Sequence, residues 1–343
     1  AAGLNKAARN HILIRDTSAL EQMRNVDVVV FDKTGTLTEG HPTVIGWLWA
    51  QGQEEHYKDV LLAAESTSDH PLAEAIVTAL EGEEQVIPAH LDGFENITGK
   101  GVRVAYQGAE YWVGSHKLLK DYQANLSDIL ADMLTQYESD GNSIVYFGRE
   151  NDLLAVIAIK DQLRVTSMEA IRELRIQDIE ICMLTGDGER TASSVAGSLG
   201  IMRFVADAMP DDKEDFIHKL QLQGKTVAMV GDGVNDAQAL SCADVSIAMG
   251  KGTDTLMDTA MITLRTSDLL LLPKVFRLSR QTVSLMYRNL FWAFIYNTVG
   301  IFVAAGVLYP VYDILLSPAL AGAAMALSCV SVALSSLRLS SRF

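Results

Sequence analysis

Up to about residue 280, the sequence alternates short, continuous apolar runs with stretches of helical periodicity. Continuous apolar runs are typical of strands that are buried on both faces of a parallel sheet. We predict strands at residues 26–31, 179–184 and 226–230, weaker strands at 243–249 and 261–264, and helices at 190–199 and 212–222. This alternation predicts a doubly wound α/β fold, in which polar motifs that follow the strands meet at one edge of the sheet.

Residues 41–150 interrupt this pattern with elements of their own. The predicted helices lie at 58–64 and 72–80, and the predicted strands lie at 102–106, 111–113 and 144–147. We therefore predict that an α+β domain, residues 41–150, is inserted after the first strand of the α/β domain. The α/β domain then comprises residues 24–40 and 151–272.

The end of the chain is almost free of charge. Residues 289–308 and 318–337 carry no charged side chain, and each run is long enough to cross about 30 Å of hydrocarbon as a helix. We predict a transmembrane hairpin within residues 273–343, with a pair of buried core helices as the alternative. Arginines flank the pair and the connecting loop has no Lys or Arg, which predicts that both ends of the hairpin face the cytoplasm.

Composition excludes several classes of protein. The chain has 343 residues, of which 49% are hydrophobic, so a folded core is expected. The net charge of −15 argues against a nucleic-acid partner. Cys182, Cys242 and Cys329 lie far apart in the sequence, so neither a disulfide framework nor a Cys-x-x-Cys metal site is expected.

The motif Asp-Lys-Thr-Gly-Thr begins at Asp32, directly after the first predicted strand. A carboxylate in a turn at a strand end can attack phosphorus and form an aspartyl phosphate. Asp232 and Asp236 lie in a second motif, Gly-Asp-Gly-Val-Asn-Asp, and with Asp32 they offer the oxygen ligands that Mg²⁺ prefers. Lys213 can supply positive charge to a transferred phosphoryl group. These residues predict phosphoryl transfer.

Together these motifs resemble those of the P-type ATPases, whose catalytic domain has a haloacid-dehalogenase-like, Rossmannoid fold. The resemblance implies that Asp32 is the phosphorylated nucleophile. It also implies that Mg²⁺ is held by Asp32, by the backbone carbonyl of Thr34 and by Asp232. The other catalytic positions that it implies are Thr185 and Lys213, as phosphate contacts, and Asn235 and Asp236, as supporting hinge residues.

The predicted insert resembles the nucleotide-binding domain of the heavy-metal subgroup, type IB. Ser68-Asp69-His70-Pro71 is similar to its Ser-x-His-Pro motif, although a His-Pro pair alone is more often a simple turn. Gly99-Lys100-Gly101 is similar to its nucleotide loop. The ATP-binding positions that the resemblance implies are Glu65 and His70, at the adenine, with Gly99, Gly101 and Asp187.

The two uncharged runs resemble the helices of the copper branch. The first contains Tyr296 and Asn297, and the second contains Met325, Ser328 and Cys329. Thioether and thiol groups suit Cu(I) or Ag(I), and the Lys and Asp expected in zinc-type helices are missing. Two departures from the branch, Cys329 in place of Ser and Phe302 in place of Pro, leave the metal open. The alternative is polar packing between helices.

The resemblance implies an ATP-driven exporter of Cu(I) or Ag(I), of which this chain is the C-terminal portion after the Cys-Pro-Cys helix. Residues 1–23 are then a linker helix from the preceding membrane span. The implied location is the plasma (inner) membrane, as a multi-pass protein with a cytoplasmic head. The implied partners are ATP, a soft monovalent metal ion, the lipid bilayer, and the actuator domain and remaining membrane helices of the full pump. Without them, this chain is not expected to complete transport.

Three alternatives remain. The first is a pump for zinc, cadmium or cobalt. The second is a membrane-anchored phosphatase of the haloacid-dehalogenase type, which would usually carry an Asp as general acid where this chain has Thr34. The third is a subunit that binds nucleotide without catalysis.

Overall fold

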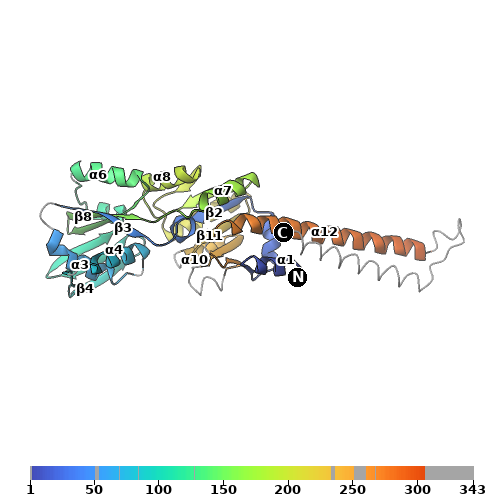
Figure 1. The fold of residues 1–343 in the computed structure, drawn as a ribbon, viewed down its shortest axis with the longest axis horizontal. Helices are drawn as coiled ribbons and strands as arrows, with labels where there is room; N and C mark the ends of the chain where they lie inside the picture. The colour runs from blue at the N-terminus through green and yellow to red at the C-terminus, as the bar shows by residue number, and fades with distance from the viewer. Residues whose placement is uncertain are drawn as a thin grey trace.

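The computed structural model describes residues 2–50, 54–68, 70–83, 85–126, 128–232, 236–250, 260–266 and 268–305. These residues form two units, each built around its own sheet, and a long helix that projects from one unit on the side away from the other (Figure 1).

The first unit contains a seven-stranded sheet with the order β1-β13-β12-β11-β2-β9-β10. The interior strand β2 (Val28–Asp32) is parallel to β11 (Val227–Gly231) on one side and to β9 (Glu180–Leu184) on the other. All five residues of β2 are buried, as expected for a strand with helices on both faces of its sheet. The doubly wound α/β fold predicted from the sequence is therefore confirmed.

The remaining elements of this unit complete the sheet and cover it. The strands are β1 (Ile12–Ile14), β10 (Arg203–Val205), β12 (Val245–Met249) and β13 (Ile262–Leu264). The helices are α1 (Ala2–Arg9), α2 (Ser18–Arg24), α7 (Ser167–Ile176), α8 (Glu189–Leu199), α9 (Pro210–Leu222) and α10 (Ala237–Cys242).

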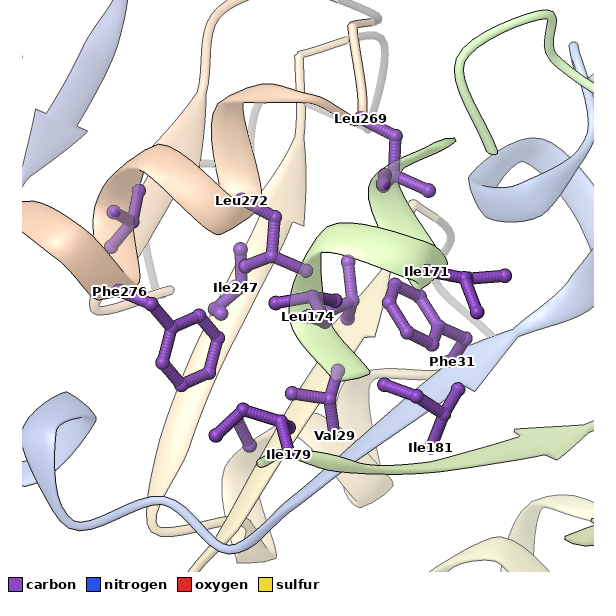
Figure 2. Close-up of a cluster of buried hydrophobic side chains, with 14 of the residues drawn as sticks. Val29, Phe31, Ile171, Leu174, Ile179, Ile181, Ile247, Leu269, Leu272 and Phe276 are labelled. Atoms are coloured by element: carbon purple, nitrogen blue, oxygen red, sulfur yellow. The ribbon is translucent and has the colours of Figure 1, made fainter. Parts of the chain in front are cut away.

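Alternate residues of β2 enter two different hydrophobic clusters. Val29 and Phe31 pack with Leu174 and Phe276 on one face of the sheet (Figure 2). Val28 and Val30 pack on the other face with a cluster that includes Ile217. Because successive side chains of a strand point to opposite faces, this one strand fixes both layers of helices.

The second unit contains a six-stranded antiparallel sheet with the order β3-β8-β7-β6-β5-β4. Its strands are β3 (Thr43–Trp49), β4 (Gly93–Ile97), β5 (Gly101–Tyr106), β6 (Ala109–Gly114), β7 (Ser143–Arg149) and β8 (Asp152–Lys160). Its helices are α3 (Glu54–Glu65), α4 (Pro71–Glu81), α5 (His116–Asp121) and α6 (Asp128–Ser139). This is the α+β insert predicted from the sequence.

The predicted boundary at residue 150 is wrong by one strand. Strand β8 pairs with β7 and with β3, so it belongs to the sheet of the insert. Its residues between Asp152 and Lys160 are all buried. A continuous buried apolar run occurs in strands of both kinds of sheet. The sequence pattern alone therefore could not assign this strand to one of the two units.

Residues 1–23 are more than the predicted linker helix. Between α1 and α2 they form β1, which pairs antiparallel with β13 at the edge of the first sheet. Ile12 and Met23 lie in the core of this unit. The segment is therefore an integral part of the α/β unit.

The long helix α12 (Leu271–Ala304) begins inside the same unit. Leu272, Val275 and Phe276 are fully buried, and the Ser279 hydroxyl donates a hydrogen bond to the carbonyl of Leu20 in α2. The predicted boundary between residues 272 and 273 therefore falls within the first turn of a continuous helix.

The far part of α12 is apolar and exposed, for example at Phe291 and Phe294. This part overlaps the predicted membrane helix at 289–308, up to Ala304. Among the described helices, including α12, none reaches the combined length and hydropathy of a bilayer-spanning segment. The second predicted membrane helix, at 318–337, lies outside the described residues.

Candidate active site

The strand order of the first sheet brings the sequence motifs together. Asp32 is the last residue of β2, Asp232 directly follows β11, and Thr185 directly follows β9. The register places Asp32 beside Leu184 and Phe31 beside Val230. Because these three strands are parallel neighbours, their carboxyl ends form one polar edge, which is the usual position of the site in doubly wound sheets.

Three carboxylates converge at this edge. Asp32, Asp232 and Asp236 each present an oxygen, and these oxygens all lie within 4.8 Å of one another. Burial, together with the negative charge of Asp32, raises the pKa of Asp232 to about 7 and also raises the pKa of Asp236. A set of crowded oxygen donors fits Mg²⁺, whose charge would relieve the repulsion between them.

Lys213 provides a positive charge within this cluster. Its Nζ donates hydrogen bonds to Asp32 Oδ1 at 2.6 Å and to Asp236 Oδ1 at 2.7 Å. Burial by itself disfavours the charged amine, but the two carboxylates outweigh burial and raise the pKa of Lys213 above its usual value. The side chain therefore stays protonated at neutral pH.

The turn after Asp32 is held in place by residues distant in the sequence. Gly35 takes the left-handed conformation, with φ +71°, and its N–H donates to Thr38 Oγ1 at 2.9 Å. The buried guanidinium of Arg164 donates to the carbonyl of Thr36 at 2.9 Å and to the carbonyl of Gly35. These contacts fix the backbone beside Asp32.

The two chain segments that connect the units pair with each other. Thr38 and Leu163 form an antiparallel bridge, and the N–H of Glu39 donates to the carbonyl of Gln162 at 2.8 Å. The carboxylate of Asp161 accepts from the Thr38 hydroxyl and from the N–H of Gly40. The connection between the units is therefore a short two-stranded element, fixed directly behind the Asp32 turn.

Sequence reasoning missed Asp161 and Arg164. A usable signal was present for Asp161, because it comes directly after the buried run that forms β8, much as Asp32 ends the buried run of β2; Arg164 follows three residues later. Polar residues at that position meet the edge of a sheet.

Lys33 is a further residue of the site to which we assigned no role from the sequence. It forms a buried ion pair with Asp187, and its Nζ donates to Ser143 Oγ of the second unit at 3.0 Å. The Thr185 hydroxyl donates to Asp187 Oδ2 at 2.9 Å. Although burial raises the pKa of Asp187, the charge of Lys33 outweighs it and the pKa is lowered. Asp187 therefore serves as the counter-ion of Lys33.

The two predicted adenine contacts lie on adjacent helices of the second unit. Glu65 ends α3 and is buried, and burial raises its pKa to about 8. His70 is the N-cap of α4, where its Nδ1 accepts a hydrogen bond from the N–H of Leu72 at 3.2 Å. Desolvation lowers the pKa of His70 and the negative charge of Asp187 opposes this. Glu65 and His70 thus lie at the end of α3 and the start of α4 within the second unit.

The two glycines of the predicted nucleotide loop have different structural requirements. Gly101 has φ +143°, and a Cβ there would lie 2.1 Å from the carbonyl oxygen of Val113, so the pairing of β5 with β6 requires glycine. Gly99 has φ +69°, and a Cβ there would lie 2.8 Å from the Cε of Met209. Met209 is the N-cap of α9, the helix that carries Lys213. At Gly99 it is the left-handed backbone that favours glycine, because the flexible end of the Met209 side chain could move away from a Cβ.

The remaining predicted residues lie in three places. Thr34 is half-buried in the turn that follows Asp32. Tyr296 and Asn297 are exposed on α12, where the Tyr296 ring lies 5.9 Å from that of Trp292. Asn235, Met325, Ser328 and Cys329 lie outside the described residues.

The chain belongs to the haloacid dehalogenase-like hydrolases, because the model of that family matches residues 26–244. This is the fold class predicted from the Asp32 motif.

Sequence relatives narrow the resemblance further. The chain is 42% identical over 337 residues to the copper-exporting P-type ATPase of Legionella pneumophila, covering 98% of this chain and 46% of the relative. It is 43% identical over 342 residues to the silver exporting P-type ATPase of Salmonella typhimurium, covering 99% of this chain and 41% of the relative. The chain thus spans less than half the length of these relatives.

Solved structures agree with this assignment. A zinc-transporting PIB-type ATPase in the E2.Pi state has a TM-score of 0.67 at 35% identity, over 99% of this chain and 54% of that one. The catalytic domain of the CPx-ATPase CopB-B has a TM-score of 0.66 at 28% identity, over 80% of this chain and 97% of that one. The resemblance to heavy-metal P-type ATPases that we expected from the motifs is confirmed.

The close approach of Gly35 to Asp232 gives a first prediction. A Cβ at Gly35 would lie 1.5 Å from Asp232 Oδ2, so we expect Gly35→Ala to displace this carboxylate and weaken Mg²⁺ binding at least tenfold. Gly108→Ala is the matched control, because Gly108 has a similar φ of +75° with no atom within 4 Å of its Cβ position. Both variants carry a backbone cost of about 1–2 kcal/mol. Equal Mg²⁺ affinity of the two variants in calorimetric titrations would contradict the proposed clash.

The buried carboxyl of Glu65 gives a second prediction. Its pKa of about 8 in the folded chain lies above the usual value of about 4.3, so the folded state keeps a proton that the unfolded state loses between these pH values. The free energy of unfolding therefore falls as pH rises through this window, by up to about 1.4 kcal/mol per pH unit from this group. We expect Glu65→Gln to remove this contribution in urea unfolding measured from pH 5 to pH 8. Glu81→Gln, at an exposed position of α4, should leave the slope unchanged, and identical slopes for wild type and Glu65→Gln would refute the assignment.

Proposed function

We propose that this chain is the catalytic head and C-terminal part of a P-type ATPase that exports Cu(I) or Ag(I), and that it forms an aspartyl phosphate at Asp32. The observation that carries the proposal is the contact of Asp32 with Lys213, within a cluster that also contains Asp232 and Asp236. Asp32 is the buried end of a central strand, so its carboxylate is held in a fixed position for attack.

In the proposed reaction, a carboxylate oxygen of Asp32 attacks the γ-phosphorus of ATP. The bond from this phosphorus to the bridging oxygen breaks, and ADP leaves with that oxygen. The ammonium of Lys213, which contacts Asp32 in the structure, would stabilise negative charge on the transferred group. Thr185, at the end of the adjacent strand, would add a hydroxyl to the phosphate site, and Asn235 and Asp236 would support it.

The cation site of the proposal uses the same edge. Asp32, Asp232 and the backbone carbonyl of Thr34 would hold Mg²⁺, and the bound ion would supply positive charge that offsets the repulsion between the carboxylate and the triphosphate. The oxygen donors that converge there support this assignment. Thr34 stands where related phosphatases carry a general acid, which favours a long-lived phosphoenzyme over rapid hydrolysis and disfavours the phosphatase alternative.

The second unit would deliver the nucleotide. Glu65 and His70 would contact adenine, and Gly99, Gly101 and Asp187 would line the path of the nucleotide towards Asp32. Direct contacts between the units support this arrangement: Lys117 Nζ donates to the carbonyl of Asp207 at 2.6 Å, and Thr191 Oγ1 donates to that of Asn142 at 2.7 Å. Catalysis then depends on the approach of the two units.

The transported ion would bind beyond the head. We propose that Tyr296, Asn297, Met325, Ser328 and Cys329 provide its ligands, in a membrane hairpin formed by residues 289–308 and 318–337. The apolar, exposed end of α12 supports contact with lipid or with further membrane helices. The full pump would be a multi-pass protein of the plasma (inner) membrane with its head in the cytoplasm, and would include an actuator domain.

Zinc is the main alternative to copper or silver as the transported metal. A zinc-transporting ATPase is among the similar solved structures, at 35% identity. The relatives named for copper and silver are 42–43% identical to this chain, and the thioether of Met325 and the thiol of Cys329 are soft donors. These observations favour Cu(I) or Ag(I) over Zn(II).

Phosphorylation of Asp32 gives the third prediction. We expect the chain, incubated with Mg²⁺ and ATP labelled at the γ-phosphate, to incorporate label that is released by hydroxylamine. Asp32→Asn should abolish incorporation, because the amide cannot act as the nucleophile. Asp27→Asn, near the opposite end of the same strand, is the matched control and should retain it. Label that persists in Asp32→Asn would refute the proposed mechanism.

Metal selectivity gives the fourth prediction. In the full-length pump that contains this chain, we expect Cu(I) or Ag(I) to stimulate ATP hydrolysis several-fold more than Zn(II) does. Met325→Ala should remove the stimulation while leaving labelling of Asp32 from ATP detectable, whereas Met202→Ala, at an exposed position of the head, should preserve both. Stronger stimulation by Zn(II) would favour the zinc alternative instead.

A further inference from the structure

A second group of metal-ligating side chains lies away from the carboxylate edge. Glu214 and His218 belong to α9, and Cys242 is the last residue of α10. Their ligand atoms all lie within 4.8 Å of one another. Because Glu214 and His218 are four residues apart, they share one face of α9, and α10 brings the thiol to that face.

The neighbours of His218 fix which ring nitrogen is free. The Nε2 of Gln221 donates to the carbonyl of Cys242 at 2.9 Å and to Asp244 Oδ2 at 3.3 Å, and both of these atoms can only accept. Gln221 Oε1 therefore faces His218, and it lies 3.1 Å from Nδ1. When the ring is neutral, an oxygen acceptor at Nδ1 places the proton on Nδ1, which leaves the lone pair on Nε2.

Nε2 is the ring nitrogen that lies near the other two donors. It is 3.4 Å from Glu214 Oε1, and the ligand atoms of Glu214, His218 and Cys242 all lie within 4.8 Å of one another. Metal-binding histidines usually donate their second N–H to an oxygen of the surrounding protein, which is the role of Gln221 here. The cluster thus has three convergent donors and a residue that orients one of them.

We propose that Glu214, His218 and Cys242 bind a divalent cation of the zinc class, with a fourth position open to water. Nitrogen, oxygen and sulfur donors of this kind, three from the protein, are typical of Zn²⁺ sites with an open position. The side chains of His218 and Glu214 are 50% and 35% exposed, so they can rotate to the roughly 2.0–2.3 Å bond lengths of Zn²⁺ without movement of the backbone. Binding replaces the thiol proton of Cys242, which is released to solvent.

The position of this site connects it to the carboxylate edge. Glu214 directly follows Lys213 in α9, and α10 begins directly after Asp236. A cation bound between the two helices would cross-link the elements that carry Lys213 and Asp236. The inference rests on the geometry of α9 and α10 and is independent of the proposed transport function.

Cobalt(II) is the probe for this site, because a thiolate ligand gives Co²⁺ a sulfur-to-metal charge-transfer absorption that carboxylates do not give. We expect the chain, held in excess Mg²⁺ to occupy the carboxylate cluster, to develop this absorption with one Co²⁺ per chain and to lose it when Zn²⁺ is added. Cys242→Ser should abolish the absorption, and His218→Gln and Glu214→Gln should each weaken Co²⁺ binding at least tenfold.

Matched variants separate this site from cobalt binding elsewhere on the chain. Asp215→Asn, an exposed carboxylate on the same helix, and Cys329→Ser should both retain the absorption and the affinity. Gln221→Ala should weaken binding about 10–100-fold while the donor set is intact, and circular dichroism establishes that each variant is folded. The proposal is overturned if no charge-transfer absorption develops, or if it survives Cys242→Ser and disappears in Cys329→Ser.

Discussion

The ammonium of Lys213 between Asp32 and Asp236 is the interaction on which the active edge depends. Three carboxylates with oxygens within 4.8 Å of one another repel strongly where water is scarce. The raised pKa values of Asp232 and Asp236 reflect that repulsion together with burial. Lys213 offsets part of it, and the remaining excess of negative charge suits the edge to the Mg²⁺ that we propose there. The strand order that brings the carboxylates together also causes the repulsion between them, which a positive charge must offset.

The backbone around Asp32 is fixed from outside its own strand. Arg164 binds the carbonyls of the turn, and Asp161 binds Thr38 and Gly40 where the chain leaves for the second unit. Both residues lie on the returning segment. The two crossings between the units therefore form one structural element with the turn that follows Asp32, and a movement of the second unit acts on that turn through a few hydrogen bonds.

Much of the first unit was predictable because strands buried in a parallel sheet have a recognisable sequence pattern. The runs that became β2, β9 and β11 are continuous apolar segments, and each is followed by a polar motif. Strand β1 was missed because it has three residues and forms by pairing with β13, some 250 positions later in the chain. Strand β8 was not predicted, and the boundary at residue 150 placed its residues in the wrong unit, because hydrophobicity does not encode the identity of the neighbouring strand.

The same division holds for the site. Asp32, Asp232 and Asp236 could be grouped from their motifs, since chemistry restricts which residues can occupy such positions. The pairing of Lys33 with Asp187 and Ser143 could not, because it joins three segments that meet only in the folded chain. Likewise, the requirement for glycine at position 101 arises from the close approach of β5 and β6, and a nucleotide loop and a tight strand pair present the same glycine in the sequence.

Because helix α12 is long, a small rotation at its buried start displaces its far end by several ångströms. Its 34 residues form one unbroken rod, about 50 Å long at 1.5 Å per residue, and its first turns are clamped into the α/β core. A rotation of the head by about 5° would move the distal end by roughly 4 Å, which is about three quarters of the pitch of one helical turn. A small rearrangement around the carboxylates that rotates the head would therefore produce a larger displacement at the distal end of α12.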